Sequence, residues 1–312
     1  MQNENPSFMC ELCLGRIQTD LLFPFPSSPE EDREMLETVV GSVDDLLGPH
    51  AEDFRTWDRA GEMPPSFVDE LKDFGLFSLV IPEEHGGLGF GATGYSRTLQ
   101  QIGRHDASVG VTVGAHSSIG MRGLLLYGTE AQKARYLEDL ASGELIAAFC
   151  LTEPGAGSDA ASIRTTAVRD GDDWVISGQK LWITNGGIAQ FFTVFAKTGA
   201  PDERRRMTAF IVTTDMPGVT IGTHEDKMGL RASSTTAVFF DEVRVSAEHI
   251  LGEEGQGFKV AMHILNSGRT GLAGGCVGGM KKLIELSSAH AGERHQFGRP
   301  IAEFGMIKAK LG

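Results

Sequence analysis

The sequence predicts an α+β protein in which a β-rich region lies between two helical regions. Helical periodicity with capping signals fills residues 28–146. Short β-rich runs separated by Gly, Asp and Asn fill residues 147–252, and the helical pattern returns over residues 253–312. We therefore expect an N-terminal extension (1–27), an N-terminal helical domain, a middle β-barrel or sandwich domain and an incomplete C-terminal helical bundle.

The N-terminal helices are predicted from their boundary residues. Residues 28–31 (Ser-Pro-Glu-Glu) form a capping box with proline at the first helical position, and apolar residues then recur at helical spacing to Leu47. A second helix is predicted over residues 65–74, with a glycine after it. Apolar helices follow to about Tyr127. A further capping box at residues 129–132 begins a helix that ends near Gly143.

The middle region contains seven runs rich in β-branched and aromatic residues, which predict an all-β domain. These runs are AAFCLT, IRTTAV, WVISG, KLWIT, FFTVFAK, MTAFIVTT and TTAVFFDEVRV. Beyond them, a helix is predicted from Gly257 to Gly292 and a final helix from about Ile301. The last helical pattern is interrupted at Gly312, so we expect the C-terminal domain to be truncated.

Charge excludes one class of function. The chain has 312 residues and a formal charge of −14, whereas nucleic-acid binding requires a basic surface. The dense basic run is Arg204–Arg206, which we interpret as a solvated hairpin tip; contact with an anionic ligand there is the alternative. No apolar segment is long enough to predict a membrane span.

Cysteine usage and the N-terminus indicate the compartment. The four cysteines give no disulfide framework, and the pair Cys10 and Cys13 lacks further ligands at zinc spacing, so no metal site is predicted. Cys150 and Cys276 lie in apolar runs and are predicted to be core thiols. The first 30 residues contain one arginine and no apolar signal region. We expect a bacterial-type cytoplasmic protein, or a mitochondrial matrix protein if the source is eukaryotic.

The string FCLTEPGAGSD, residues 149–159, is the most informative segment for chemistry. A strand carries the Thr152 hydroxyl to its end, and the glycine-rich turn allows backbone N–H groups to approach a ligand. The glycines alone favour an ordinary β-turn capped by Ser158 and Asp159. No helix follows at the spacing of a dinucleotide-binding motif.

Taken whole, this string resembles a signature of the acyl-CoA dehydrogenase family. The resemblance extends from about Leu22 to the end, and the HILNSGR and LFPFP segments resemble the very-long-chain branch. The matching segments, in order, are IPEEHGGLGFG, FCLTEPGAGSD, GQKLWITNGG, KMGLRASST, FFDEVRV, LGEEGQGFKVAMHILNSGR and ERHQFGRP.

The resemblance implies FAD as cofactor. It places Trp182 beside the isoalloxazine and Thr184 near its reactive N5 edge, whereas the residues alone would favour a buried aromatic with a partnered threonine. It also places Arg294 on the FAD of a second subunit, where a guanidinium suits phosphate oxygens. The full cofactor set implied is Phe149, Cys150, Leu151, Thr152, Gly157, Ser158, Trp182, Ile183, Thr184, Arg294, Gln296 and Phe297.

The substrate set implied by the resemblance is Ser158, Asn266, Ser267, Gly268 and Arg269. Some relatives carry a catalytic glutamate immediately before the arginine, where this chain has Gly268, and the very-long-chain branch carries it in a Glu-Gly-Thr context that this sequence lacks. No catalytic residue is therefore assigned here. Glu153 is expected to cap its turn and not to act as the base.

The resemblance implies oxidation of a long- or very-long-chain acyl-CoA to the trans-2-enoyl-CoA in fatty-acid β-oxidation, with electrons passing to an electron-transferring flavoprotein. It also implies a homodimer or higher homo-oligomer for the intact protein. A catalytically silent flavin-binding or partner-binding module, and a flavin oxidase, remain alternatives. The small residues from Gly271 to Gly279 either make room for an acyl chain or permit close helix packing.

Overall fold

The computed structural model describes residues 7–25, 29–199 and 206–312. The chain divides into two compact units, residues 1–39 and 40–312, which are described separately. The first contains α1 (Phe8–Cys13), a 3-10 turn (Thr19–Leu21) and the beginning of α2 (Glu30–Leu47). The expected Ser28 cap and the arginines at 204 and 205 lie outside the described residues.

The N-terminal helical region is confirmed. Its helices after α2 are α3 (Ala51–Ala60), α4 (Pro65–Asp73), α5 (Ala92–His105), α6 (Ala107–Gly114), α7 (Arg122–Tyr127) and α8 (Glu130–Ser142), with a π-helical turn (Ala115–Gly120) between α6 and α7. The Thr129–Gln132 capping box forms, and Gly143 ends α8 in the left-handed conformation at φ 80°. Helix α3 was not predicted, although Glu52 and Asp53 in its first turn and a glycine after it are its boundary signals.

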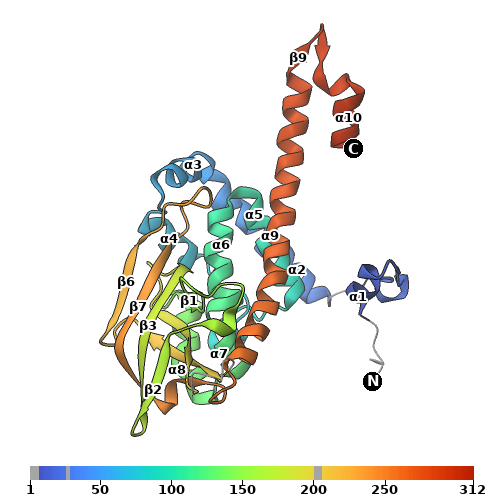
Figure 1. Ribbon diagram of the computed structural model, residues 1–312. Helices are drawn as coiled ribbons and strands as arrows, with labels where there is room; N and C mark the ends of the chain where they lie inside the picture. The colour runs from blue at the N-terminus through green and yellow to red at the C-terminus, as the bar shows by residue number, and fades with distance from the viewer. Residues whose placement is uncertain (1–6, 26–28, 200–205) are drawn as a thin grey trace. The chain divides into compact units, whose positions relative to one another are not determined.

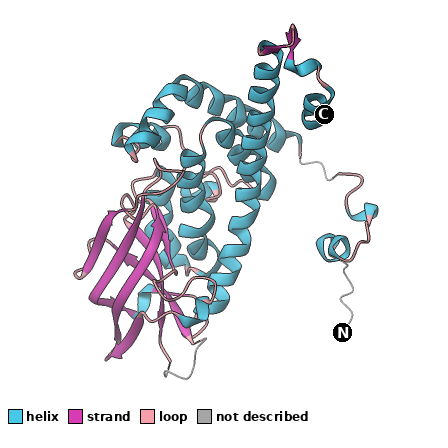
Figure 2. Cartoon of the chain, turned by 45° about the horizontal axis from the view of Figure 1, so that its top comes forward, coloured by secondary structure: helices cyan, strands magenta, loops and turns pink. Residues whose placement is uncertain are grey.

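The middle region forms one mixed sheet in the order β6-β7-β3-β2-β4-β5-β8, with β1 paired to β4. Figure 2 shows the strands gathered together in one region. A single pair, Thr166 with Lys197, joins β2 to β4, so the sheet folds over itself there. Trp174 of one half packs edge-on against Phe210 of the other, with ring centroids 5.9 Å apart. The strands are β1 (Ala147–Cys150), β2 (Thr166–Asp170), β3 (Asp173–Thr184), β4 (Phe191–Lys197), β5 (Met207–Thr213), β6 (Val219–His224), β7 (Thr235–Ser246) and β8 (Ile250–Leu251).

Two details of the strand prediction are corrected. WVISG and KLWIT belong to the single strand β3, because Gly178, the last residue of the first run, pairs with Phe240 of β7 at a register shift and does not end the strand. Strand β6 was missed because none of its residues is fully buried, so its sequence lacks an apolar run.

The C-terminal region begins with the long helix α9 (Gly257–Glu293), as predicted. The final helix was placed wrongly: a hairpin of β9 (His295–Gln296) and β10 (Arg299–Pro300) and a 3-10 turn precede α10 (Gly305–Leu311). Gly298 at φ 77° makes the hairpin turn, and a proline then prevents helix from resuming at once. The second half of α9 exposes apolar side chains such as Leu283 and extends past the N-terminal helices (Figure 1).

Glycines set the contact between α5 and α9. A Cβ atom on Gly274 would lie 2.4 Å from the Ser96 carbonyl oxygen, and one on Gly278 would lie 1.8 Å from the Gln100 carbonyl oxygen. No side chain fits at either position, so the two backbones touch. A Cβ on Gly279 would meet its nearest heavy atom only at 3.7 Å. Some of the α9 glycines therefore serve close helix packing.

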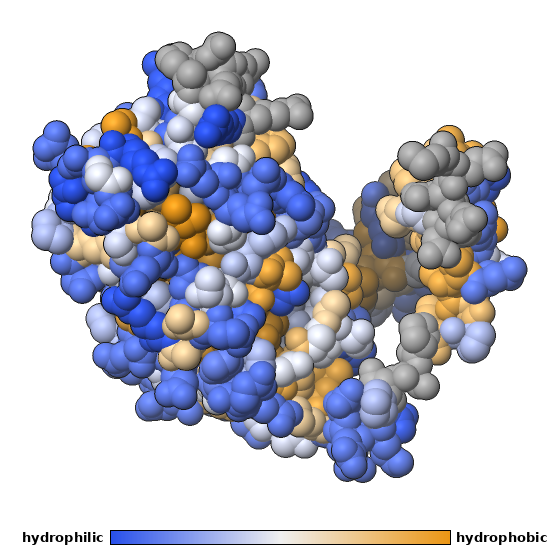
Figure 3. Space-filling model, turned by 90° about the horizontal axis from the view of Figure 1, so that it is seen from below, coloured by the Kyte–Doolittle hydropathy of each residue, from blue (hydrophilic) through white to orange (hydrophobic). Residues whose placement is uncertain are grey.

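Hydrophilic residues cover most of the face drawn in Figure 3, with smaller apolar patches between them. Within the described ranges, no helix has both the length and the apolar character that a bilayer span needs.

Candidate functional site

The end of β3 presents an exposed aromatic side chain. Trp182 is 60% exposed and has φ 57°, in a register shift of the β3–β7 ladder. Such an irregularity re-aims side chains, and positive φ in a bulky residue is strained. The neighbouring Ile183 is buried, and Thr184 is half-buried. Trp182 and Thr184 are therefore accessible to a ligand, whereas Ile183 can offer a ligand only its backbone.

The loop after β1 lies beside this segment. The Leu181 N–H donates to the Thr152 carbonyl oxygen at 2.9 Å, which joins the loop to β3. Gly157 is exposed, and a Cβ there would meet nothing within 4 Å, so one side of the turn is open. Cys150 and Leu151 have buried side chains, and burial raises the pKa of the Cys150 thiol well above its ordinary value. These two predicted cofactor residues can contribute only backbone atoms.

Glu153 was expected to cap its own turn, and this prediction is wrong. Its carboxylate accepts from Lys180 Nζ at 2.7 Å and from the backbone N–H groups of Arg164 and Thr165 at 2.5 Å and 3.0 Å. The turn is instead closed by backbone hydrogen bonds between Glu153 and Ala156. Burial alone would raise the pKa of Glu153, but the nearby Lys180 ammonium and these donors outweigh it and lower the pKa. The buried pair fixes the loop to β3.

Asn185 joins the same segment to the helical region. Its side-chain amide donates to the Thr112 carbonyl oxygen on α6 at 2.9 Å, and its backbone adopts φ 65°. The Asn185 backbone N–H donates to the Ser234 carbonyl oxygen. Asn185 is fully buried. The position of Trp182 and Thr184 is consequently set by contacts with both the helices and the sheet.

An apolar cavity of about 480 Å³ lies between the N-terminal helices and α9. Thr184 and Leu230 lie in its wall, and in the described part of the chain that wall contains no carboxylate. Cys276 also lies there and is exposed, so its prediction as a core thiol is wrong, because this part of α9 borders the cavity and not the core. Glycines make up much of the wall: Gly103, Gly110, Gly114, Gly268, Gly271, Gly275 and Gly279.

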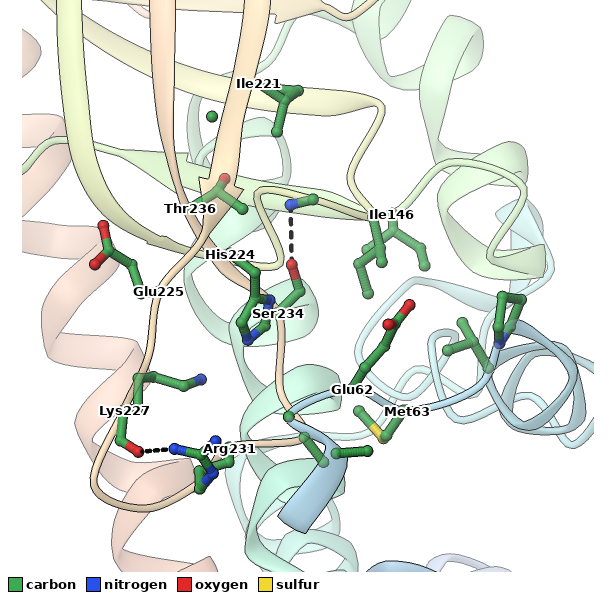
Figure 4. Close-up of a pocket in the computed structure, with 18 of the residues that line it drawn as sticks. Glu62, Met63, Ile146, Ile221, His224, Glu225, Lys227, Arg231, Ser234 and Thr236 are labelled. Atoms are coloured by element: carbon green, nitrogen blue, oxygen red, sulfur yellow. Dashed lines mark hydrogen bonds between the residues drawn. The ribbon is translucent and has the colours of Figure 1, made fainter. Parts of the chain in front are cut away.

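A larger cavity, of about 700 Å³, lies between the α3–α4 connection and strands β6 and β7 (Figure 4). The cationic side chains Lys227 and Arg231 already donate hydrogen bonds to other residues of the protein. Lys227 donates to Ser233 and Thr235, and Arg231 donates to Asp226 and to the Lys227 carbonyl oxygen. Because the donors of Lys227 and Arg231 are already used within the protein, this cavity offers an anionic ligand few free donors from these two side chains.

The predicted substrate residues separate into different places. Gly268 and Arg269 line the apolar cavity with Thr184. Asn266 and Ser267 line another, smaller cavity, although Arg269 Nη1 donates to Asn266 Oδ1 at 2.6 Å. The remaining residue, Ser158, lies on the exposed glycine turn and in neither cavity.

The predicted FAD contacts Arg294, Gln296 and Phe297 are exposed in the segment that follows α9. Twenty-six positions of helix separate Gly268 from Arg294, which at 1.5 Å per residue is roughly 39 Å. A single chain does not bring these residues to Thr184. Their assignment to the FAD of a second subunit remains a prediction.

The fold is an α+β arrangement in which an apolar cavity borders Thr184 at the end of β3. Three family models match the chain: Acyl-CoA dehydrogenase, N-terminal domain (29–144), middle domain (148–243) and C-terminal domain (255–312). An acyl-CoA dehydrogenase of Bacillus subtilis is 40% identical, and the match covers 81% of this chain and 67% of the relative. The chain therefore belongs to the acyl-CoA dehydrogenase family.

A second relative and a solved structure are also similar to this chain. The mitochondrial very long-chain specific acyl-CoA dehydrogenase of Homo sapiens is 47% identical over 99% of this chain and 48% of its own length. The chain thus spans about half the length of that relative. An acyl-CoA dehydrogenase of Bacillus anthracis, solved in complex with FAD, superposes with a TM-score of 0.83 at 36% identity, covering 95% of this chain and 50% of that one.

Several residues of the site were not found from the sequence. Lys180 and Asn185 had not been singled out, because a lone lysine or asparagine in a strand gives no signal until its partner is placed. Gly110 and Gly114 carried a usable signal: glycines four apart in an apolar helical run face the same side of the helix. That spacing, with the glycines of α9, could have indicated the cavity.

Proposed function

We propose that this chain forms the flavin- and acyl-binding framework of a dehydrogenase that converts long-chain acyl-CoA to trans-2-enoyl-CoA. The observation that carries the proposal is the glycine-walled apolar cavity that reaches Thr184. An apolar cavity is suited to an acyl chain, because burying apolar surface is what makes such binding favourable.

The residues present fit FAD. Trp182 leaves a large aromatic surface uncovered, the half-buried Thr152 and Thr184 supply hydroxyls, and the open turn at Gly157 allows close approach of a ligand. Bound FAD supplies the acceptor for the hydride from the substrate β-carbon. Trp182 would pack beside the ring system, and Thr184 would donate a hydrogen bond at its edge.

The dimensions of the cavity support a long acyl chain. Its wall on α9 runs from Leu265 to Gly279, fourteen residues apart or roughly 21 Å of helix. On α6, Cβ atoms at Gly110 and Gly114 would meet their nearest heavy atoms only at 3.8 Å. A larger side chain at either glycine would occupy cavity space, so these positions set the room for the acyl tail.

As far as the structure describes it, the cavity wall lacks a group that could remove the α-proton of the substrate. The described wall of the cavity holds no carboxylate, whereas dehydrogenation needs a base within hydrogen-bond reach of the substrate α-carbon. We infer that a carboxylate from outside these 312 residues removes the α-proton. The same observation favours a second candidate, in which this chain by itself binds flavin or a partner without turnover.

The wider assignments rest on the family. We expect an electron-transferring flavoprotein as electron acceptor, and a homodimer or higher oligomer in which Arg294, Gln296 and Phe297 reach the FAD of a second subunit. We also expect a mitochondrial matrix location, or the cytoplasm of a bacterium.

Reconstitution with FAD tests the proposal. We expect the purified chain to retain FAD, and palmitoyl-CoA to perturb the flavin absorption spectrum. Gly110→Leu should weaken palmitoyl-CoA binding by about tenfold or more, since several methylene contacts are lost, and should leave butyryl-CoA binding nearly unchanged. Gly292→Ala, at an open position on α9, is the control. Absence of flavin binding, or equal losses for both substrates, would contradict the proposal.

A further inference from the structure

A third cavity, of about 380 Å³, lies on another face of α9. Asn266 and Thr270 of α9 line it, whereas Gly268 and Leu272 line the apolar cavity. Since successive helical residues are about 100° apart, the two pairs point to nearly opposite sides of α9. The third cavity therefore opens on a different side of α9 from the proposed acyl site, and the two cavities adjoin at Ser118, which lies in both walls.

Arg122 brings a cation to this cavity. Its side chain is half-buried, its Nε atom is buried without a hydrogen-bond partner, and among the described residues no carboxylate forms an ion pair with it. A cation withdrawn from water without an anionic partner destabilises the protein. The Arg122 charge also lowers the pKa of Tyr95, although burial, the larger effect, raises that pKa to about 12.

Ser117 supplies a second unsatisfied group. Its side chain lies in the cavity wall, is 0% exposed, and its Oγ has no hydrogen-bond partner in the described part of the chain. Buried hydroxyls nearly always have a partner, because leaving one unpaired costs free energy. Ser117 belongs to the π-helical turn Ala115–Gly120, and such irregular turns are frequent at functional sites.

The N-terminus of α5 supplies backbone donors. Gly91 caps this 14-residue helix without a side-chain hydrogen bond, the first turn contains no acidic residue, and Gly91 and Ala92 lie in the cavity wall. The first N–H groups of a helix have no partner within the helix, and the helix dipole makes this end positive. Such an end favours an anion.

We propose that this cavity binds a small oxyanion, a carboxylate or phosphate group, between Arg122, the Ser117 hydroxyl and the first-turn N–H groups of α5. Each of the three is a donor, and an oxyanion is the acceptor that satisfies them together. The larger cavity beside β6 and β7 differs in this respect, because Lys227 and Arg231 already donate to protein acceptors there.

Thermal denaturation of the 312-residue chain in inorganic phosphate, and separately in acetate, tests the site. At least one anion should raise the melting temperature with saturation, relative to chloride at equal ionic strength, because a ligand that binds the folded state stabilises it. In Arg122→Gln the concentration for half of the effect should rise at least about tenfold. Arg97→Gln, which removes an exposed arginine of α5, should behave as the unmodified chain.

Ser117→Ala provides a second reading, since it keeps the packing and removes the orphaned hydroxyl. This variant should weaken binding of the same anion. If that anion is phosphate, the lower affinity should also appear as less broadening of the ³¹P resonance by the protein. The proposal is overturned if neither anion gives a saturable effect, or if Arg122→Gln and Arg97→Gln respond alike. Saturation by phosphate alone assigns a phosphate group, and saturation by acetate alone assigns a carboxylate.

Discussion

Lys180 Nζ lies 2.7 Å from the Glu153 carboxylate, and both side chains are almost completely removed from solvent. The pair connects the loop that contains Thr152 to the strand that contains Trp182. Lys180 also donates to the Leu151 carbonyl oxygen at 3.3 Å. An internal ion pair thus determines the spacing of the two segments proposed to hold the flavin.

Removing the lysine should destabilise the protein strongly. Lys180→Met leaves the Glu153 carboxylate buried without its counter-charge, which should lower the free energy of unfolding by about 3–5 kcal/mol. Urea denaturation measures the change. The double variant Lys180→Met/Glu153→Gln should recover part of the loss, because it removes the charge that the single variant strands. If the single variant is as stable as the unmodified chain, the pair does not hold the loop.

His116 should make stability depend on pH. Burial lowers its pKa from 6.5 to about 4, and its Nδ1 accepts from the Ala147 N–H at 3.0 Å. Between these two pKa values the unfolded chain binds a proton that the folded protein does not, so stability falls as pH falls from 6.5 toward 4. Lowering the pH from 7 to 5 should cost about 2 kcal/mol from this group.

The variant His116→Gln should lose this part of the pH dependence, whereas His290→Gln, at an exposed position on α9, should keep it. Urea denaturation at pH 7 and pH 5 gives both values. An unchanged difference between the two pH values in His116→Gln would show that His116 is not the group responsible.

Trp182 should contribute to flavin retention. Trp182→Ala removes an aromatic surface that is 60% exposed in the chain without ligand, and should weaken FAD binding roughly 2- to 10-fold. Equilibrium dialysis of FAD measures the dissociation constant. Val168→Ala, at an exposed apolar position on β2, is the matched control. Equal FAD affinity in all three proteins would argue against a flavin beside Trp182.

Two neighbouring glycines of α9 should respond in opposite ways. Gly278→Ala places a Cβ 1.8 Å from the Gln100 carbonyl oxygen, so α5 and α9 must separate and stability should fall by at least about 2 kcal/mol. Gly279→Ala meets nothing closer than 3.7 Å and should be neutral or stabilising by up to about 1 kcal/mol. The melting temperatures of the two variants test this difference. Similar values would rule out backbone contact at Gly278.

Gly268→Glu should introduce a weak base. A Cβ there lies 2.8 Å from Ile119 Cγ2 and 3.4 Å from Ser118 Oγ, so the Ile119 side chain must move to admit it. With FAD bound, palmitoyl-CoA should bleach the flavin slowly under anaerobic conditions in this variant and not in Gly268→Gln. Prompt bleaching in the unmodified chain would mean that one of its own residues is the base.

Much of the fold was predictable because its signals are local. The Thr129–Gln132 capping box and Gly143 fixed the bounds of α8 within one residue. Strand β6 was missed because its pattern carries no buried residue. The last helix was misplaced because the hairpin around Gly298 has strands of only two residues, which are too short to show an alternating pattern in the sequence.

The sequence by itself determined the family and the order of helical and β regions, because these depend on motifs and on local periodicity. Only the tertiary structure revealed the Glu153–Lys180 pair, which joins residues 27 positions apart. Only the tertiary structure divided the α9 glycines between backbone contact at Gly278 and a cavity wall at Gly279. The physical reason is that a glycine's role depends on what lies opposite it, and sequence spacing does not contain that information.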